Sequence, residues 1–148
     1  MLQLPTGVTI CAVPTESVLQ AWVMVRSFVE LALMQGLGEH EPEDVFEALH
    51  SGKAQLWLAT DFDKAIQGIA VTEVITYPGR KVCNLWLVAG TELNQWQGGL
   101  RHIESWALAQ GCDLLQATCR PGAARKAERL GFVVMRHQVF KPLLRNQQ

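Results

Sequence analysis

The stretch from Val82 to Phe132 constrains the fold of this chain more than any other part of its sequence. Its pattern predicts a strand at Val82–Val88, a loop with three glycines at Ala89–Gly99, and then a helix, a second strand and a second helix. A helix between two strands makes them parallel, with a right-handed crossover. The unpaired amides at a helix N-terminus also favour an anion such as a phosphate. The stretch therefore predicts an α/β unit with a candidate phosphate loop.

The other elements are predicted from apolar periodicity and from the positions of glycine and proline. We expect strands at Thr9–Val13, Ala54–Thr60, Ala65–Thr76, Cys112–Cys119 and Val133–Phe140, and helices at Thr15–Met34, Pro42–His50, Leu100–Gln110 and Pro121–Leu130. The order is β-α-α-β-β-β-α-β-α-β, an α/β chain with a mixed central sheet flanked by helices. At 148 residues, the chain is expected to be a single domain over residues 1–148.

Two of the helices are predicted to turn a broad apolar face inward. In the first, with Thr15 as N-cap, the inward residues are Val18, Leu19, Trp22, Val23, Val25, Phe28, Val29 and Ala32. In the last, they are Ala123, Ala124, Ala127 and Leu130. The long first helix could serve a homodimer, or it could be covered fully by the sheet.

Charge is distributed unevenly along the chain. The formal net charge of -1 argues against nonspecific nucleic-acid binding, so no nucleic-acid partner is expected. Acidic residues gather between Glu16 and Asp63, and basic residues gather from Arg120 onward. Two interpretations stay open: two solvated faces of opposite sign, or a basic edge for an anionic cofactor with an acidic rim for a cationic substrate or partner.

The four cysteines show neither a C-x-x-C pair nor a zinc pattern with histidines, so no metal site is expected. They are interpreted as reduced core residues of a cytoplasmic protein: Cys11, Cys83, Cys112 and Cys119. The N-terminus lacks the features of a signal peptide, and the longest apolar run is too short to span a membrane. No membrane partner is expected.

Two segments of the chain resemble a known family. Ile103–Cys112 is similar to the third helix and the start of the fifth strand of the GCN5-related N-acetyltransferase (GNAT) superfamily, and Ala123–Phe132 is similar to its fourth helix with a Gly-Phe end. The resemblance implies that acetyl-CoA lies where the fourth and fifth strands splay, with its pyrophosphate on the loop after the fourth strand. The implied cofactor-binding residues are Leu87, Val88, Gln95, Gln97, Gly98, Gly99, Arg101 and Arg120.

The sequence departs from this family at three positions. The family loop ends in a small residue where this chain has Leu100, so a side chain there would crowd the pyrophosphate unless Gly98-Gly99 shifts the register. Ala127 stands where the family tends to have a tyrosine that acts as general acid, and Arg120 stands where it tends to have an asparagine. Trp96, in the same loop, could cover a ligand or a partner surface.

Glu73 is the candidate catalytic residue. It stands among valine and isoleucine in a predicted strand, where a carboxylate that faces a cleft could act as general base toward an amine. If strand alternation turns it to solvent instead, it is an ordinary surface residue. His102 is interpreted as an exposed helical residue.

Two functional hypotheses follow from the resemblance. The first is an acetyl-CoA-dependent N-acetyltransferase acting on an amine of a small molecule or a protein. The alternative is a GNAT-like binding or assembly protein without catalysis. Cys119-Arg120-Pro121-Gly122 before a short helix resembles small phage and prophage members of the family, which would make the partner a phage assembly protein.

Overall fold

The structure is a computed structural model, and it describes residues 7–91 and 96–145. These residues form two compact units that divide between Thr118 and Cys119. The first unit contains the sheet with helices α1, α2 and α3, and the second contains helix α4. The two units are described separately, and the expectation of a single domain over residues 1–148 stays a prediction.

The sheet has five strands in the order β1-β2-β3-β4-β5. They span Thr9–Val13, Ala54–Thr60, Ile66–Thr76, Lys81–Gly90 and Leu114–Ala117. The first four are antiparallel neighbours, and β5 lies parallel to β4, as predicted. β5 begins later than predicted because the N–H of Cys112 donates to the carbonyl of Ala107, at the end of the preceding helix, over 2.9 Å.

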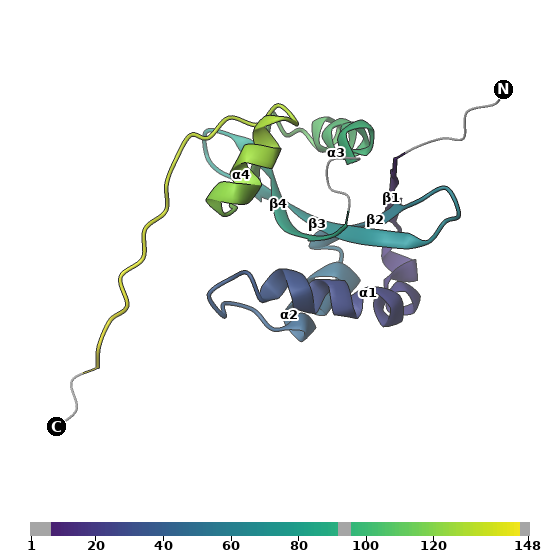
Figure 1. The fold of residues 1–148 in the computed structure, drawn as a ribbon, viewed down its shortest axis with the longest axis horizontal. Coiled ribbons are helices and arrows are strands. Elements are labelled where there is room, and N and C mark those ends of the chain that lie inside the picture. Colours follow the sequence, from purple (N-terminus) through teal and green to yellow (C-terminus); the bar gives the residue numbers. More distant parts are fainter. Residues whose placement is uncertain (1–6, 92–95, 146–148) are drawn as a thin grey trace. The chain divides into compact units, whose positions relative to one another are not determined.

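Helices cover both faces of this sheet (Figure 1). α1 (Val18–Leu33) and α2 (Pro42–His50) pack on one face. Their core holds buried, mostly aliphatic side chains from both layers: Val18, Ala21, Val25, Val29, Val45, Leu49, Leu56, Ile69, Val71 and Leu87. Burial of this face, rather than helix propensity, stabilises α1, since valine is a poor helix former.

α3 (Gln97–Ala109) covers the opposite face of the sheet. Here Trp57 donates its indole N–H to the hydroxyl oxygen of buried Thr72 over 2.9 Å, and its ring meets Trp106 edge to face at 5.5 Å between centroids. Cys83 is fully buried against Ala107. Burial raises the pKa of the Cys83 thiol to about 11.

The start and orientation of α1 differ from the sequence prediction. Thr15 is not an N-cap: it opens a 3₁₀ turn at Thr15–Ser17, and α1 follows from Val18. Leu19 and Val23 are exposed, so their predicted burial is wrong, and the sheet does not cover α1 fully. The helix rests on one sheet face only and buries just the side that carries Val18, Val25 and Val29.

The cysteines divide into two buried and two exposed residues. Cys83 and Cys112 lie in the core, as expected, and all four thiols are free. Cys11 and Cys119 are exposed, so their interpretation as core residues is wrong. Cys11 lies in β1, where successive side chains alternate between the two faces of the edge strand.

In the second unit, α4 spans Pro121–Glu128 and buries none of its residues. Of the predicted inward face, Ala124, Ala127 and Leu130 are half-buried, whereas Ala123 is exposed. The predicted strand Val133–Phe140 is wrong, because residues 132–145 form neither helix nor strand. A strand exists only through hydrogen bonds to a neighbour, and no described strand pairs with these residues. Valine-rich composition alone does not supply that partner.

Within the described ranges, no helix is both long and apolar enough to cross a membrane.

Candidate active site

β4 has different neighbours along its two halves. β5 pairs with β4 only from Val82 to Leu85, through the register Val82↔Leu114 to Leu85↔Ala117. From Trp86 to Gly90, β4 keeps β3 on one side and has no strand on the other among the described residues. The register with β3 also shifts at Trp86, which marks a β-bulge. Leu87 and Val88, two predicted cofactor residues, lie in this open half.

α3 begins without a side-chain cap from the described residues. Gly98, in its first turn, is exposed, and a Cβ added there would meet no atom within 4 Å. Gly99 is buried, and a Cβ there would come within 2.6 Å of Ile10 Cγ1. Gly98 therefore places no side chain over the first-turn amides, whereas Gly99 allows α3 to pack closely on β1.

Leu100 does not lie where the family pattern placed it. Its side chain is buried, with 7% of its surface exposed, on the packed side of α3. The prediction that it would crowd a pyrophosphate at the helix start is therefore wrong. Successive residues of a helix are rotated by about 100°. The turn from exposed Gly98 to packed Gly99 therefore directs the side chain of Leu100 toward the core.

Trp96 precedes α3 and fills the interior rather than covering an exposed ligand. It is 6% exposed, and a Cβ on Gly68 would lie 2.7 Å from its ring. Its indole N–H is buried and has no hydrogen-bond partner among the described residues. Beneath the ring, β3 and β4 approach so closely that a Cβ on Gly90 would lie 2.5 Å from the carbonyl oxygen of Gln67.

The other predicted cofactor residues stay predictions. Gln95 lies outside the described residues, and the side chain of Gln97 is not among those described. Arg101 is exposed in α3. Arg120 belongs to the second unit and directly precedes α4 there.

Glu73 is half-buried in β3, opposite Ala54 of β2 and Asn84 of β4. The side-chain amide of Asn84 donates to its carboxylate over 2.9 Å, and Gln116 in turn donates to Asn84 over 3.4 Å. Glu73 also borders a cavity of about 160 Å³ with mainly polar walls: Thr15, Lys53, Gln55, Thr72, Trp106 and Gln110 among others. The carboxylate is thus held in place and reaches a polar cavity, as a base requires.

Glu73 and the open half of β4 are separated along the strand. Asn84, the partner of Glu73, precedes Val88 by four positions, or roughly 13 Å at about 3.3 Å per residue. This distance is too long for a single hydrogen bond, so a group held at Val88 cannot transfer a proton directly to Glu73. A base role for Glu73 needs water between the two groups.

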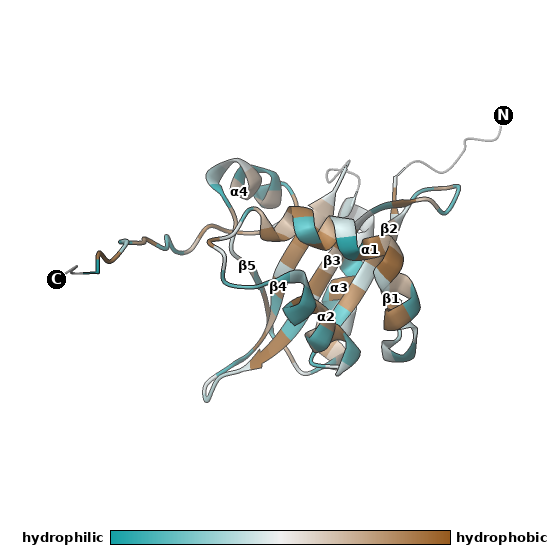
Figure 2. Cartoon of the chain, turned by 90° about the horizontal axis from the view of Figure 1, so that it is seen from below, coloured by the Kyte–Doolittle hydropathy of each residue, from teal (hydrophilic) through white to brown (hydrophobic). Residues whose placement is uncertain are grey.

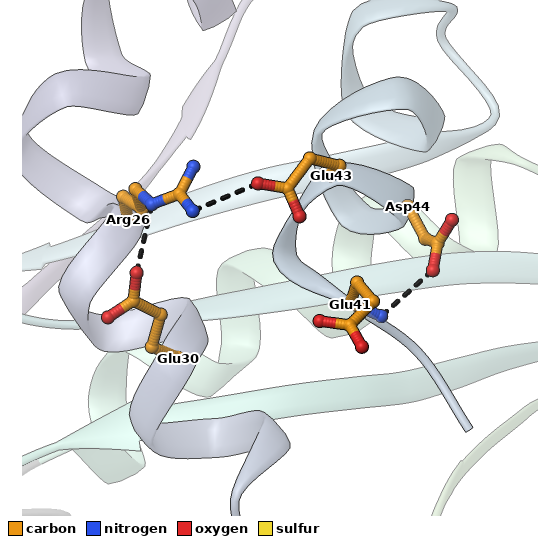
Figure 3. Close-up of polar contacts among 5 residues, drawn as sticks. All are labelled: Arg26, Glu30, Glu41, Glu43 and Asp44. Carbon is orange, nitrogen blue, oxygen red and sulfur yellow. Dashed lines mark hydrogen bonds and ion pairs between the residues drawn. The ribbon is translucent and has the colours of Figure 1, made fainter. Parts of the chain in front are cut away.

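The acidic residues around α2 make contacts within the chain (Figure 3). Arg26 of α1 forms ion pairs with Glu30 and with Glu43, both at 2.9 Å, and the backbone N–H of Glu41 donates to Asp44 over 2.8 Å. The pKa of Glu43 is lowered by its own backbone N–H and then by Arg26, which has a raised pKa. These contacts support the interpretation of a solvated face over that of an acidic substrate rim.

Two contacts near the site were not found from sequence. One is the series of hydrogen bonds that links Glu73, Asn84 and Gln116. Its signal in the sequence was a polar residue within each of two apolar strand runs. The other is His40, in the connection between α1 and α2, whose ring meets Trp86 edge to face at 5.0 Å between centroids. His40 thus brings that connection over the point where β4 loses β5.

Across the described positions, no three His, Cys, Asp or Glu side chains are grouped so that they could hold a metal ion.

Comparison with known proteins gives matches in structure only. No family model and no curated protein sequence matches the chain. Among solved structures, it is similar to an aminoglycoside acetyltransferase from an uncultured soil metagenomic sample, in complex with sisomicin, with a TM-score of 0.69 at 11% identity over 93% of this chain and 97% of the other.

Two further structures have the same arrangement. Aminoglycoside N-acetyltransferase AAC(6')-Iy in complex with CoA matches with a TM-score of 0.65 at 14% identity, over 95% of this chain and 99% of the other. An integron cassette protein from the mobile metagenome of V. cholerae matches with a TM-score of 0.60 at 17% identity, over 96% and 95% of the two chains. The chain therefore has the fold of the GNAT acetyltransferases, which confirms the fold predicted from its sequence.

Proposed function

We propose that the chain is an acetyl-CoA-dependent N-acetyltransferase. The observation that carries the proposal is the open half of β4 beside the start of α3. An extended ligand with an amide-rich arm and a pyrophosphate matches a strand edge that no described strand pairs with and a helix N-terminus that no described side chain caps. The likeness in fold to acetyltransferases, one of them in complex with CoA, supports it.

Leu87 and Val88 would bind the pantetheine arm and the thioester through their backbone groups, and the amides around Gly98 would bind the pyrophosphate. In the reaction, the amine nitrogen attacks the thioester carbonyl, so that a C–N bond forms and the C–S bond breaks. Glu73 takes the proton of the amine through water, and CoA leaves as its thiolate with the electron pair of the C–S bond. Asn84 positions the carboxylate through its 2.9 Å hydrogen bond.

Calorimetry with acetyl-CoA and CoA tests the proposal. We expect binding at micromolar dissociation constants for both. Absence of binding at millimolar ligand would remove the enzymatic function and favour the binding or assembly protein without catalysis. Because one similar structure is a sisomicin complex, an amine panel that begins with sisomicin is the first set of acceptors to assay.

The variant Gly98→Glu separates binding from folding. A carboxylate in the first turn suits the helix dipole, so we expect no loss of stability, while it repels a pyrophosphate and weakens acetyl-CoA binding at least about tenfold. Gly79→Glu is the matched control, since Gly79 is also exposed with nothing within 4 Å of an added Cβ and lies in the turn before the opposite end of β4. Equal binding by both variants would contradict a pyrophosphate site at α3.

A further inference from the structure

Residues 133–145, here called the tail, leave the end of α4 as an extended trace (Figure 1). Gly131 ends the helix at a φ of +95°, and the N–H of Phe132 donates to the carbonyl of Ala127 over 3.1 Å. Beyond Phe132, the tail makes no backbone hydrogen bond among the described residues. Figure 2 shows hydrophobic colour along it, from large apolar side chains that are exposed: Val133, Val134, Met135, Val139, Phe140, Leu143 and Leu144.

The composition of the tail is typical of a strand. Residues 133–140 include three valines and a phenylalanine, with Arg136 as their single formal charge. Pro142 has no N–H to donate, so it sets the end of a strand here. Contiguous exposed apolar side chains mark an interaction site, and a strand needs a hydrogen-bonded neighbour. The tail therefore has the sequence of a strand whose partner is missing.

β5 has a free strand edge. It pairs with β4 alone, and no described strand lies on its other side. Strands in parallel pairing are normally buried on both faces, yet none of the residues of β5 is buried, and Leu114 is 42% exposed. An unpaired edge is a template for an added strand. Incomplete burial of β5 is what a sheet shows when its next strand is missing.

Charge and backbone chemistry select the kind of surface that the tail fits. Residues 1–118 carry 13 acidic and 6 basic side chains, a net charge of -7, whereas residues 119–148 carry 1 acidic and 7 basic side chains, a net charge of +6. The two parts of the sequence are thus complementary in charge. A lipid surface or a nucleic acid would attract the basic part, but neither supplies the backbone groups that a strand pairs with. A sheet edge on an acidic body supplies both.

Such an edge exists on this chain, so the tail could pair with its own β5 or with that of a second copy. The tail has a high effective concentration at its own β5, because the two are covalently joined. It is nevertheless unpaired among the described residues. A second copy presents the same edge, and a reciprocal exchange pairs both tails and covers both β5 strands at once. The second copy is therefore the occupant that fits.

We propose that two copies of the chain exchange their tails, so that residues 133–140 of each form a strand on the free edge of β5 in the other. The exchange is isologous, since each copy both gives and accepts a strand. Main-chain hydrogen bonds supply the pairing, and the apolar side chains of the tail cover β5. This goes beyond the proposed function, which concerns the half of β4 from Trp86 to Gly90.

Sedimentation equilibrium of the full chain is the first test. We expect a dimer with a dissociation constant at or below about 10 µM. Val133→Asp combined with Val139→Asp places two charges on one side of the exchanged strand, and it should weaken the dimer at least about 100-fold. A wild-type chain that is monomeric up to about 1 mM overturns the proposal.

The matched control adds the same charge to the same tail. Leu143→Asp combined with Leu144→Asp changes two similarly exposed apolar residues that lie beyond Pro142, outside the proposed strand. We expect it to weaken the dimer less than about tenfold. Equal weakening by the two double variants would show that charge, and not a strand at residues 133–140, holds the dimer, and would overturn the exchange.

Cross-linking distinguishes exchange from pairing within one chain. All variants carry Cys11→Ser and Cys119→Ser, which remove the two exposed thiols. One protein then carries Ala117→Cys on β5, and a second carries Val139→Cys in the tail. When both are co-expressed and treated with a short bis-maleimide, we expect the two chains to be linked. Phe62→Cys, at a 61% exposed position between β2 and β3, replaces Ala117→Cys in the control and should give no link.

A single chain that carries both Ala117→Cys and Val139→Cys completes this test. If it is linked only within itself, and the co-expressed pair is not linked, the tail pairs with its own β5 and the exchange is overturned. Linkage of the co-expressed pair with none in the Phe62→Cys control supports the exchange.

Salt dependence tests the charge complementarity. The dimer brings a basic tail against an acidic body, so raising the salt concentration from about 50 mM to about 500 mM should weaken association. A dimer that is strengthened by salt would show a contact between like charges and would overturn the choice of β5 as the partner of the tail.

Discussion

The two halves of β4 differ in how the neighbouring strands pair with them. From Val82 to Leu85 the strand is paired on both sides, and its residues are tied to the core through Cys83 and to the neighbouring strands through Asn84. From Trp86 to Gly90 it is tightly packed on the β3 side and has no described strand on the other. In the proposed function, Asn84 in the first half positions the carboxylate of Glu73 on β3, and the second half offers a strand edge to the ligand. The proposed base and the proposed binding edge therefore lie along the same pair of strands.

The largest expected effect tests whether the first half contributes to chemistry. Glu73→Gln keeps the hydrogen-bonded shape of the side chain but removes the base, so turnover should fall about 10²-fold or more. Acetyl-CoA binding, measured by calorimetry, should stay unchanged because Glu73 lies roughly 13 Å from Val88 along the sheet. Glu104→Gln, at an exposed position on α3, is the control. Full turnover by Glu73→Gln would exclude the base role.

The second expected effect tests how tightly the open half is packed against β3. Gly90→Ala places a Cβ 2.5 Å from the carbonyl oxygen of Gln67, at a φ of +148°, so it should lower the free energy of unfolding by about 2 to 4 kcal/mol. Gly79→Ala meets nothing within 4 Å and should change it by less than about 0.5 kcal/mol. Urea unfolding measures both. Similar midpoints would show that β3 and β4 can separate at Gly90 without cost.

The smallest expected effect tests the burial of the first half. In the folded chain the Cys83 thiol has a pKa of about 11, whereas in the unfolded chain it has a pKa near the ordinary value of 9.0. The stability due to this thiol is therefore complete below about pH 9 and falls between pH 9 and 11, by at most about 1.4 kcal/mol per pH unit. Urea unfolding across that range should show a shallower decline in Cys83→Ala than in the wild type. Parallel declines would mean that Cys83 ionises in the folded chain.

Local sequence patterns predicted the elements of the first unit and the parallel placement of β5. Both depend on short-range signals, namely strand composition, glycine and Pro-Gly at the ends of elements, and the helix between β4 and β5. They could not show which half of β4 is open, because that depends on where β5 stops and on a bulge at Trp86. Neither the end of β5 nor the bulge can be recognised from the amino-acid composition.

Three errors share a different physical cause. For α1, valine and leucine occur on both sides of the helix, so periodicity gave an apolar face that was too wide, and Leu19 and Val23 were turned inward. For residues 133–140, β-propensity predicted a strand without the partner that a strand needs. For Leu100, the family pattern gave the position of the residue in the sequence but not the side of the helix on which its side chain lies. Each error concerns a contact between elements rather than an element.

The insertion of α1 and α2 between β1 and β2 has a consequence for the order of folding. β2, β3 and β4 follow one another through short turns, whereas β1 pairs with β2 only after the chain has closed over residues 14–53. Loop closure costs entropy before long-range pairing compensates for it. We therefore expect the β2–β4 meander to be formed in the transition state, with φ-values well above those of β1. β1, with α3 resting on it, would join the sheet last.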